Sequence, residues 1–162
     1  MSYSNLIDET IRYYTGDTKR IQHFLKVFAF ASTIGELEKL DPVTLHNLKT
    51  ASIVHDIGIK LCEEKYGSCE GKLQEKEGPA EAKKMLRNLS YDEKTIERVC
   101  WLIAHHHTYN QIDSEDYQIL VEADFLVNLC EDNADLSAIK AAYQNIFRTE
   151  SGKKMCRRMF AL

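Results

Sequence analysis

Residues that interrupt helices are scarce in this sequence, which has two prolines and seven glycines in 162 positions. No β-hairpin signature is present, while long runs rich in Leu, Ile, Ala, Lys and Glu follow helical spacing. With 44% hydrophobic residues, the chain is long enough to bury one core and too short for two ordinary domains. We therefore predict an all-α fold, a single domain over residues 1–162 in which about six to eight helices form a bundle.

Cysteine pairs of the C-x-x-C type are also absent, and the five cysteines are an odd number. This argues against a disulfide framework or a structural zinc knuckle and is typical of reduced thiols in a cytoplasm. The N-terminus lacks a basic segment followed by an apolar one, and nowhere do about 18 apolar residues follow one another. We therefore expect a cytoplasmic protein with no membrane partner.

Charge of one sign is not concentrated anywhere in the chain. Its 25 acidic and 21 basic residues are interspersed and give a net charge of −4. Because a nucleic-acid backbone is bound by a basic stripe, we expect no nucleic-acid partner. A mildly acidic protein can still bind a small phosphorylated molecule where a local cation or metal offsets the charge.

Apolar periodicity divides the chain into helices separated by caps and glycines. A first helix over residues 3–14 ends at Gly16, Asp17 caps a second that runs to about residue 40, and Asp41-Pro42 starts a third. The polar residues 62–78 lack a clear period and contain several glycines, so we predict a long loop there. Further helices are predicted over residues 80–89, from 93 toward 105, over 115–129, and as one or two helices within 135–160.

The third predicted helix ends in an imidazole and a carboxylate side by side, His55 and Asp56, and Gly58 is expected to let the chain turn after them. Neighbours on a helix lie about 100° apart, but at a helix end both side chains can reach one cation. Imidazole suits Zn, Fe, Mn or Ni, and carboxylate suits the harder metals. On its own the pair is equally compatible with a helix-terminal histidine and an aspartate that accepts a backbone hydrogen bond.

Two further candidate ligands fall on other predicted helices. His23 lies in an apolar helix, where a lone histidine is more often a core residue bonded to a neighbour. Asp124 lies in the apolar run 119–127, where an unpaired carboxylate costs several kcal/mol, so it needs a metal or an ion pair with Arg20 or Lys60. Helical bundles build metal sites from inward-facing histidines and carboxylates on facing helices. The sequence therefore offers the ingredients of one site with two His and two Asp.

Three successive histidines, His105, His106 and His107, follow the fifth predicted helix. If the helical phase continues through them, His107 lies in line with the apolar stripe, His106 at its edge and His105 on the opposite side. The alternative is a frayed and solvated helix end. Glu75 and Glu122 are expected to be solvated or to orient ligands.

The sequence resembles the H…HD…D signature of the HD-domain superfamily, with His23, His55-Asp56 and Asp124 in that order along the chain. The members of this superfamily are all-helical metal-dependent phosphohydrolases. Residues 53–58 resemble the family's HDIG phrase, and residues 121–126 resemble its D-A-D-x-L phrase. The resemblance covers a motif-bearing core of about residues 20–130, with C-terminal helices over 135–160 in the same HD domain.

The resemblance implies that His23, His55, Asp56 and Asp124 bind a divalent metal ion and leaves its identity open among Mn, Fe, Co, Ni, Zn and Mg. In such a site, metal-bound water is the nucleophile and the metal polarises the phosphoryl group. Asp56 is then catalytic as well as a ligand.

Three more residues gain expected roles from the same resemblance. Lys60 lies where family members often carry a lysine that contacts phosphate, although here Ile-Lys rather than Lys follows the HDIG phrase. His106 and His107 are expected to contact the substrate phosphate or to donate a proton to the leaving group.

The sequence departs from the two-metal members of the superfamily at one position. Those members have another histidine ahead of a Gly-Ala pair, and Gln74 stands in that slot here, with Glu75 and Glu77 nearby. Glutamine is a poor ligand compared with imidazole, so either the second metal is absent or one of the two glutamates replaces the histidine. We expect one metal ion per chain.

The leading interpretation is a metal-dependent phosphohydrolase, a phosphomonoesterase or a phosphodiesterase, that acts on a nucleotide or another small phosphorylated metabolite. The alternative is a non-catalytic HD-type module that binds a metal or nucleotide as a sensor or scaffold. An HD-type oxygenase is a third interpretation, but it needs two irons and is weakened by Gln74. The substrate stays open, as does the oligomeric state, for which a homodimer is one arrangement.

Overall fold

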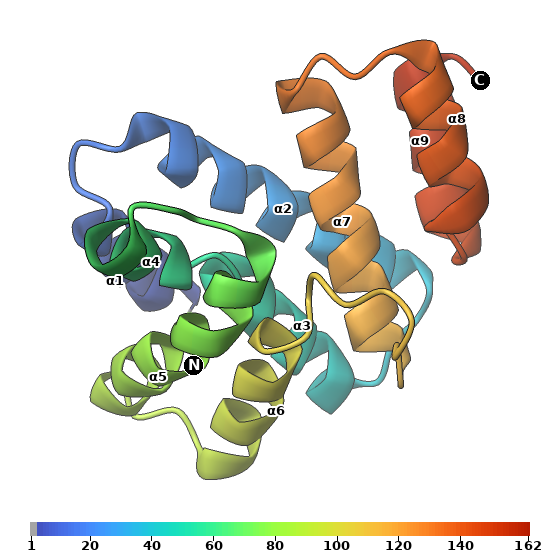
Figure 1. The fold of residues 1–162 in the computed structure, drawn as a ribbon. Helices are drawn as coiled ribbons and strands as arrows, with labels where there is room; N and C mark the ends of the chain where they lie inside the picture. The colour runs from blue at the N-terminus through green and yellow to red at the C-terminus, as the bar shows by residue number, and fades with distance from the viewer. Residues whose placement is uncertain (1–2) are drawn as a thin grey trace.

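The computed structural model describes residues 3–162, and all the regular structure within them is helical (Figure 1). Nine helices lie in this part of the chain: α1 (Tyr3–Tyr13), α2 (Thr18–Leu37), α3 (Pro42–Val54), α4 (Gly58–Tyr66), α5 (Gly71–Asn88), α6 (Glu93–Ile103), α7 (Glu115–Glu131), α8 (Leu136–Asn145) and α9 (Glu150–Phe160). The predicted all-α class is confirmed, with one helix more than the upper end of the predicted range.

Helix α3 is the central helix of the bundle and packs against α1, α2, α6 and α7. Every residue over 50–55 is buried, as expected for a helix that is covered on all sides. Asp41 caps its first turn by accepting hydrogen bonds from the backbone N–H groups of Val43 and Thr44 at 2.9 and 3.2 Å. The helix that ends at His55-Asp56 is therefore also the helix around which the core forms.

Helix α7 is the other deeply buried helix and packs against both α2 and α3. Its residues 116–124 are buried except at position 118. Because α2, α3 and α7 contact one another pairwise, side chains that project from them into their shared interior meet at one place.

The predicted loop over residues 62–78 is wrong, because most of this stretch is helical. Helix α4 continues to Tyr66, Gly67 ends it with a φ of +63°, and α5 begins at Gly71. Residues 72–77 are lysine, leucine, glutamine and glutamate, which are strong helix formers. Pro79 consequently lies inside α5, eight residues after its first residue, and not at the start of a helix over 80–89.

Gly58 was expected to let the chain turn, and the turn between α3 and α4 lies directly before it, at residues 55–57. Among the glycines of residues 3–162, only Gly16 and Gly67 have positive φ values, and Gly58 is the first residue of α4. A Cβ atom on Gly58 would lie 2.8 Å from the backbone N of Gly78 and 3.0 Å from the carbonyl O of Gln74. The missing side chain therefore lets α4 and α5 approach closely, which brings Gln74 to the end of α3.

The C-terminal helices α8 and α9 are joined to the bundle through a buried glutamate. Glu122 of α7 is fully buried, so of its two predicted roles, a solvated side chain or one that orients ligands, the first is wrong. Its carboxylate accepts hydrogen bonds from the backbone N–H groups of Arg148 and Thr149, at 2.6 and 2.9 Å, and from the Thr149 hydroxyl at 2.5 Å. A Cβ atom on Gly152 would lie 1.9 Å from this carboxylate. Glu122 thus binds the start of α9, where backbone N–H groups lack helical partners.

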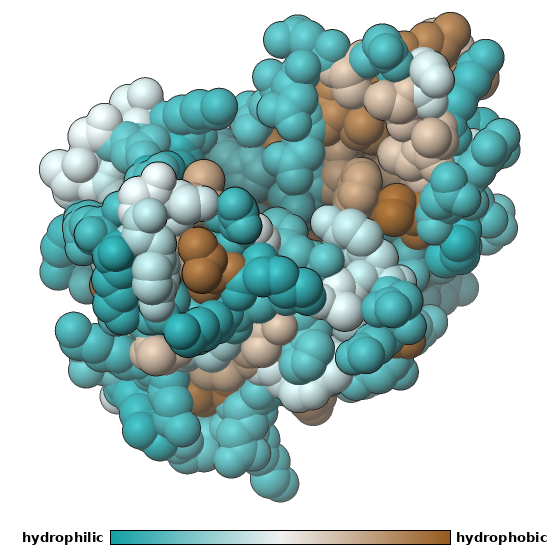
Figure 2. All heavy atoms as spheres, in the orientation of Figure 1, coloured by the Kyte–Doolittle hydropathy of each residue, from teal (hydrophilic) through white to brown (hydrophobic). Residues whose placement is uncertain are grey.

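Apolar side chains on the face shown in Figure 2 gather where α8 and α9 flank α7, and most of the remaining face is hydrophilic. Within residues 3–162, no helix combines the length and the apolar character needed to cross a membrane.

Candidate metal centre

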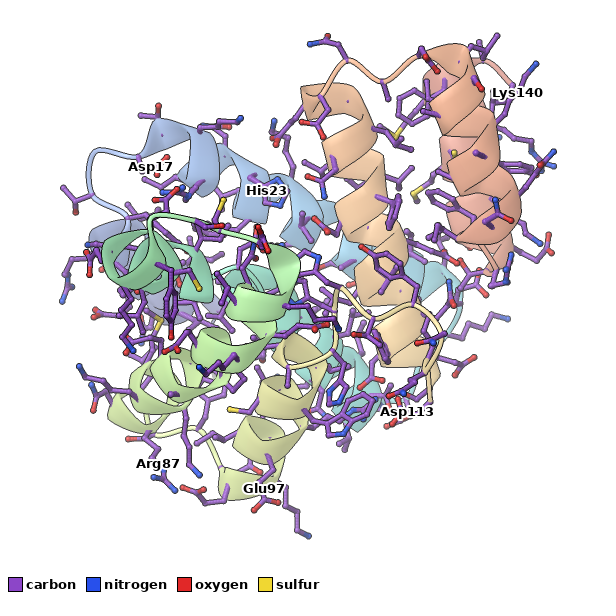
Figure 3. The ribbon with its side chains drawn as sticks, viewed as in Figure 1. Asp17, His23, Arg87, Glu97, Asp113 and Lys140 are labelled. Atoms are coloured by element: carbon purple, nitrogen blue, oxygen red, sulfur yellow. The ribbon has the colours of Figure 1, made fainter. Side chains whose placement is uncertain are left out.

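The four side chains predicted as metal ligands converge from α2, the end of α3, and α7. His23, labelled in Figure 3, projects from α2, and its Nε2 lies 3.3 Å from Nε2 of His55. Asp124 Oδ1 lies 3.2 Å from His23 Nε2 and 3.6 Å from His55 Nε2. Asp56 Oδ2 lies 3.4 Å from each of the two imidazole nitrogens. The structure therefore brings all four side chains to one point.

Backbone carbonyls fix the orientation of two imidazoles at this point. His55, which is fully buried, donates from Nδ1 to the carbonyl O of Ser52 at 3.0 Å. His106 donates in the same way from Nδ1 to the carbonyl O of Ile103 at 2.8 Å. Because each Nδ1 donates to a carbonyl, Nε2 is the atom of each ring that faces the cluster and can bind an ion in the neutral form.

Two tyrosines at the end of α1 hold the backbone of the turn that carries Asp56. The hydroxyl of Tyr14 donates to the carbonyl O of Asp56 at 2.7 Å, and that of Tyr13 donates to the carbonyl O of Ile57 at 3.2 Å. The Asp56 side chain is 20% exposed, compared with 9% for Asp124. The turn is therefore fixed from α1 while its carboxylate stays the more accessible of the two.

The donor set fits a divalent metal ion. Within residues 3–162, the buried atoms Asp124 Oδ1 and His106 Nε2 have no hydrogen-bond partner, which is rare for buried polar atoms and calls for a ligand. Ligand atoms of His23, His55 and Asp56 lie within 4.8 Å of one another. Imidazole nitrogen together with carboxylate oxygen suits first-row transition metals. The ionisable groups nearest Asp124 Oδ1 are the two histidines, and the predicted alternative of an ion pair with Arg20 or Lys60 is not formed within residues 3–162.

Opposite charges within the cluster shift the pKa values of its members. Burial lowers the pKa of His55, but the carboxylates of Asp56 and Asp124 outweigh burial and raise it well above its ordinary value. Burial raises the pKa of Asp56, but His55 and His106 outweigh it and hold this pKa well below its usual range. Both carboxylates are therefore ionised at neutral pH and can bind a cation.

The three successive histidines separate into two groups. His106 is 2% exposed, and its Nε2 lies 3.4 Å from Asp56 Oδ1. His107 joins these two in a second group of ligand atoms within 4.8 Å of one another, and burial, with His106 adding to it, lowers its pKa to about 4. His105 instead stacks on Trp101 with ring centroids 4.2 Å apart. Since α6 ends at Ile103, the turn that follows it, and not a continued helical phase, decides this placement.

Gln74 faces this second group. It stands at the position where two-metal members of the HD-domain superfamily were noted to have a histidine. Its Oε1 accepts from His107 Nε2 at 3.2 Å, and its amide N donates to the carbonyl O of Cys69 at 2.6 Å. Glu75 is buried and accepts from the backbone N–H of His107 at 3.1 Å, so it orients a neighbour of the cluster and is not solvated. Glu77 points toward α4, where Lys65 and Tyr66 donate to it at 2.7 Å.

A cavity of about 200 Å³ opens onto the cluster, and its walls include Lys19, Arg20, His23, Asp56, Asn128 and Glu131. Lys60 lies elsewhere, in a neighbouring hollow with Tyr13 and Arg20. Its ammonium donates to the carbonyl O of Tyr13 at 3.2 Å and lies 5.1 Å from the centre of that ring. The phosphate contact expected of Lys60 stays a prediction.

Glu131 is a residue of the site that sequence reasoning missed. Its Oε2 lies 3.0 Å from Nδ1 of His23, and its Oε1 accepts from Lys26 Nζ at 2.8 Å. A carboxylate that binds the second nitrogen of a metal-binding histidine fixes the ring and raises its basicity. Glu131 follows Asp124 by two helical turns on the same face of α7, and this spacing is the signal that could have revealed it.

Comparisons with known proteins agree with this geometry. The sequence model of the HD domain family, described as "HD domain", matches residues 20–139. Among solved structures, the chain is similar to a crystal structure described as a predicted HD superfamily hydrolase from an uncultured Thermotogales bacterium. That match has a TM-score of 0.66 and 26% sequence identity and covers 97% of this chain and 82% of the other. No curated protein matches the chain.

Proposed function

Because this chain belongs to the HD domain family, we propose that it is a metal-dependent phosphohydrolase that acts on a nucleotide or another small phosphorylated metabolite. The observation that carries this proposal is the convergence of His23, His55, Asp56 and Asp124 on one point, with the Oδ1 atom of Asp124 buried and lacking a hydrogen-bond partner within residues 3–162. Such a cluster is expensive to bury unless a cation compensates its carboxylates.

His23, His55, Asp56 and Asp124 would hold the divalent ion, for which Mn, Fe, Co, Ni, Zn and Mg are the candidates. When bound, such an ion supplies an activated water and stabilises charge on the phosphoryl oxygens. Hydrolysis forms a bond between the water oxygen and phosphorus, breaks the bond from phosphorus to the ester oxygen, and leaves that oxygen in need of a proton.

The residues beside the candidate ligands can supply the proton that the leaving oxygen needs. Asp56 lies between the two groups, with Oδ2 facing His23 and His55 and Oδ1 facing His106. His106 presents its buried Nε2 to Asp56 Oδ1, whereas His107, whose pKa burial lowers to about 4, is neutral at pH 7 and donates its Nε2–H to Gln74. We therefore assign proton donation to the leaving group to His106 and not to His107.

One ion per chain remains our proposal. A second ion would have to be held by Asp56, His106 and His107, and Gln74 contributes only an amide oxygen that already accepts a hydrogen bond from His107. Amide oxygen is a weaker ligand for transition metals than imidazole.

The test combines metal analysis with turnover. The purified chain is freed of metal, titrated with each candidate ion, and assayed with a panel of nucleotides and sugar phosphates. We expect one equivalent of metal, phosphate release from at least one substrate, and the loss of both metal and turnover in Asp56→Ala. If no ion binds at any concentration tested, the proposal fails.

The same measurements separate the other interpretations. Bound metal together with a thermal shift on addition of a nucleotide, but without turnover of any substrate, would select a non-catalytic sensor or scaffold. About two iron ions per chain would instead support the oxygenase interpretation, because an HD-type oxygenase needs two metal ions.

A further inference from the structure

Lys19 is a charged residue at the mouth of the metal centre, and it has no protein partner within the described part of the chain. It is exposed, lines the cavity of about 200 Å³ that contains His23 and Asp56, and forms no ion pair or hydrogen bond within residues 3–162. It precedes His23 by one turn of α2, so both side chains lie on the same face, about 6 Å apart along the helix axis. The long lysine stem lets its ammonium reach a group bound at His23.

The other charged walls of this cavity are already paired or lie farther away. Arg20 contacts Asp17 at 2.6 Å and Glu63 at 2.5 Å, and Glu131 binds Lys26 and His23. Asp132 is exposed and follows Asp124 by eight residues, about 12 Å along the axis of α7. At that separation salt screens an exposed charge, whose range in physiological solution is about 8 Å. Among the wall residues that the structure describes, Lys19 is thus the cation without a protein partner, and it can bind an anionic ligand at the cluster.

The size of the cavity limits what that ligand can be. Pockets that enclose a drug-sized molecule measure about 300–1,000 Å³, and this cavity measures about 200 Å³. It has room for a phosphate group and a few adjoining atoms, so the second organic group of a diester would have to lie outside it. A terminal phosphate is also a dianion near neutral pH, because its second pKa is about 6, whereas a diester carries one charge.

We propose that Lys19 binds the substrate phosphate and makes the centre selective for terminal phosphate monoesters over diesters. This inference rests on the proposed phosphohydrolase function and decides between its two forms. Lys19 acts here in substrate recognition, and the proton transfer stays with His106.

The test compares Lys19→Ala with Lys140→Ala in metal-loaded protein. Lys140 is an exposed lysine of α8, and Figure 3 shows it at the far end of the molecule from His23. The two variants therefore remove the same charge from different places. The probes are p-nitrophenyl phosphate, bis-p-nitrophenyl phosphate and inorganic phosphate, and metal content is checked to be equal in all proteins.

We expect the unaltered chain to prefer the monoester. Lys19→Ala should lower kcat/KM for the monoester about tenfold, mainly through KM, because one charge-assisted hydrogen bond is lost. Its effect on the diester should stay within twofold, and Lys140→Ala should leave both substrates within twofold. Preference for the diester, or an equal loss on both esters in Lys19→Ala, would overturn the inference.

Inorganic phosphate separates this inference from the proposed function. Its affinity for the metal-loaded protein, measured by calorimetry, should fall about tenfold in Lys19→Ala and not in Lys140→Ala. If no protein hydrolyses either ester, the proposed function fails, while the phosphate titration still decides whether Lys19 binds the anion. Equal phosphate affinity in all three proteins would refute the role of Lys19 whatever the turnover.

Discussion

Replacement of Glu131 by glutamine should weaken metal binding although it replaces none of the four candidate ligands. The Glu131 side chain is 15% exposed and binds His23 Nδ1 at 3.0 Å and Lys26 Nζ at 2.8 Å. A glutamine of the same shape can still accept from the imidazole, but the bond loses its charge. Hydrogen bonds to charged groups contribute about 1.5–3 kcal/mol and neutral ones about 0.5–1.5. The difference of about 1.4 kcal/mol corresponds to a tenfold weaker metal affinity.

The chain offers a matched control for this experiment in Glu77. Its side chain is 12% exposed and also accepts from an exposed lysine, Lys65, at 2.7 Å, but it faces α4 and not the cluster. Calorimetric titration of metal-free protein with Mn²⁺ or Co²⁺ should show the tenfold loss in Glu131→Gln and less than a twofold loss in Glu77→Gln. Equal affinities in Glu131→Gln and the unaltered chain, with helical content unchanged by circular dichroism, would refute the idea that Glu131 acts through His23.

Two further outcomes follow from the buried charges. Glu122→Gln should destabilise the fold by about 2 kcal/mol, because the carboxylate that accepts from the backbone N–H groups just before α9 becomes neutral. Thermal unfolding should then occur about 4–8 °C lower, and an unchanged Tm would contradict this account of how α9 is held. Metal affinity should rise as the pH increases through neutrality. The pKa values of His23 and His55 are raised in the metal-free chain, and the protons that these imidazoles bind compete with the ion. The expected rise is up to about tenfold per pH unit for each imidazole that loses a proton. Titrations between about pH 6 and 8 check the sign, and an affinity that does not change with pH would be the contrary result.

Spacing and residue type carried most of the information about the fold and the four candidate ligands. His23, His55 and Asp124 each lie on an apolar helix, where a polar side chain must find a partner, and a bundle of this size leaves one shared interior for them. The caps at Asp17 and Asp41 were predicted for the same local reason, since their side chains bind N–H groups within three residues.

What was not predicted depends on contacts between distant segments. Gly58 looks like a turn residue in sequence, but it is needed because Gly78, twenty positions later, packs against its Cα. Residues 62–78 look like a loop because glycines are frequent there, yet contacts between α4 and α5 keep most of them helical. The hydrogen bond from Tyr14 to the backbone of Asp56 has no periodicity that could reveal it.

The order in which the candidate ligands occur along the chain bears on when the centre can form in a cell. The ribosome delivers the N-terminal part first, so His23, His55 and Asp56 emerge well before Asp124, and Glu131, which orients His23, comes later still. Until α7 has been made and has packed on α2 and α3, the early ligands share no enclosed interior. We therefore expect the ion to enter after translation of this domain, through the cavity beside His23 and Asp56, into a bundle that is already assembled.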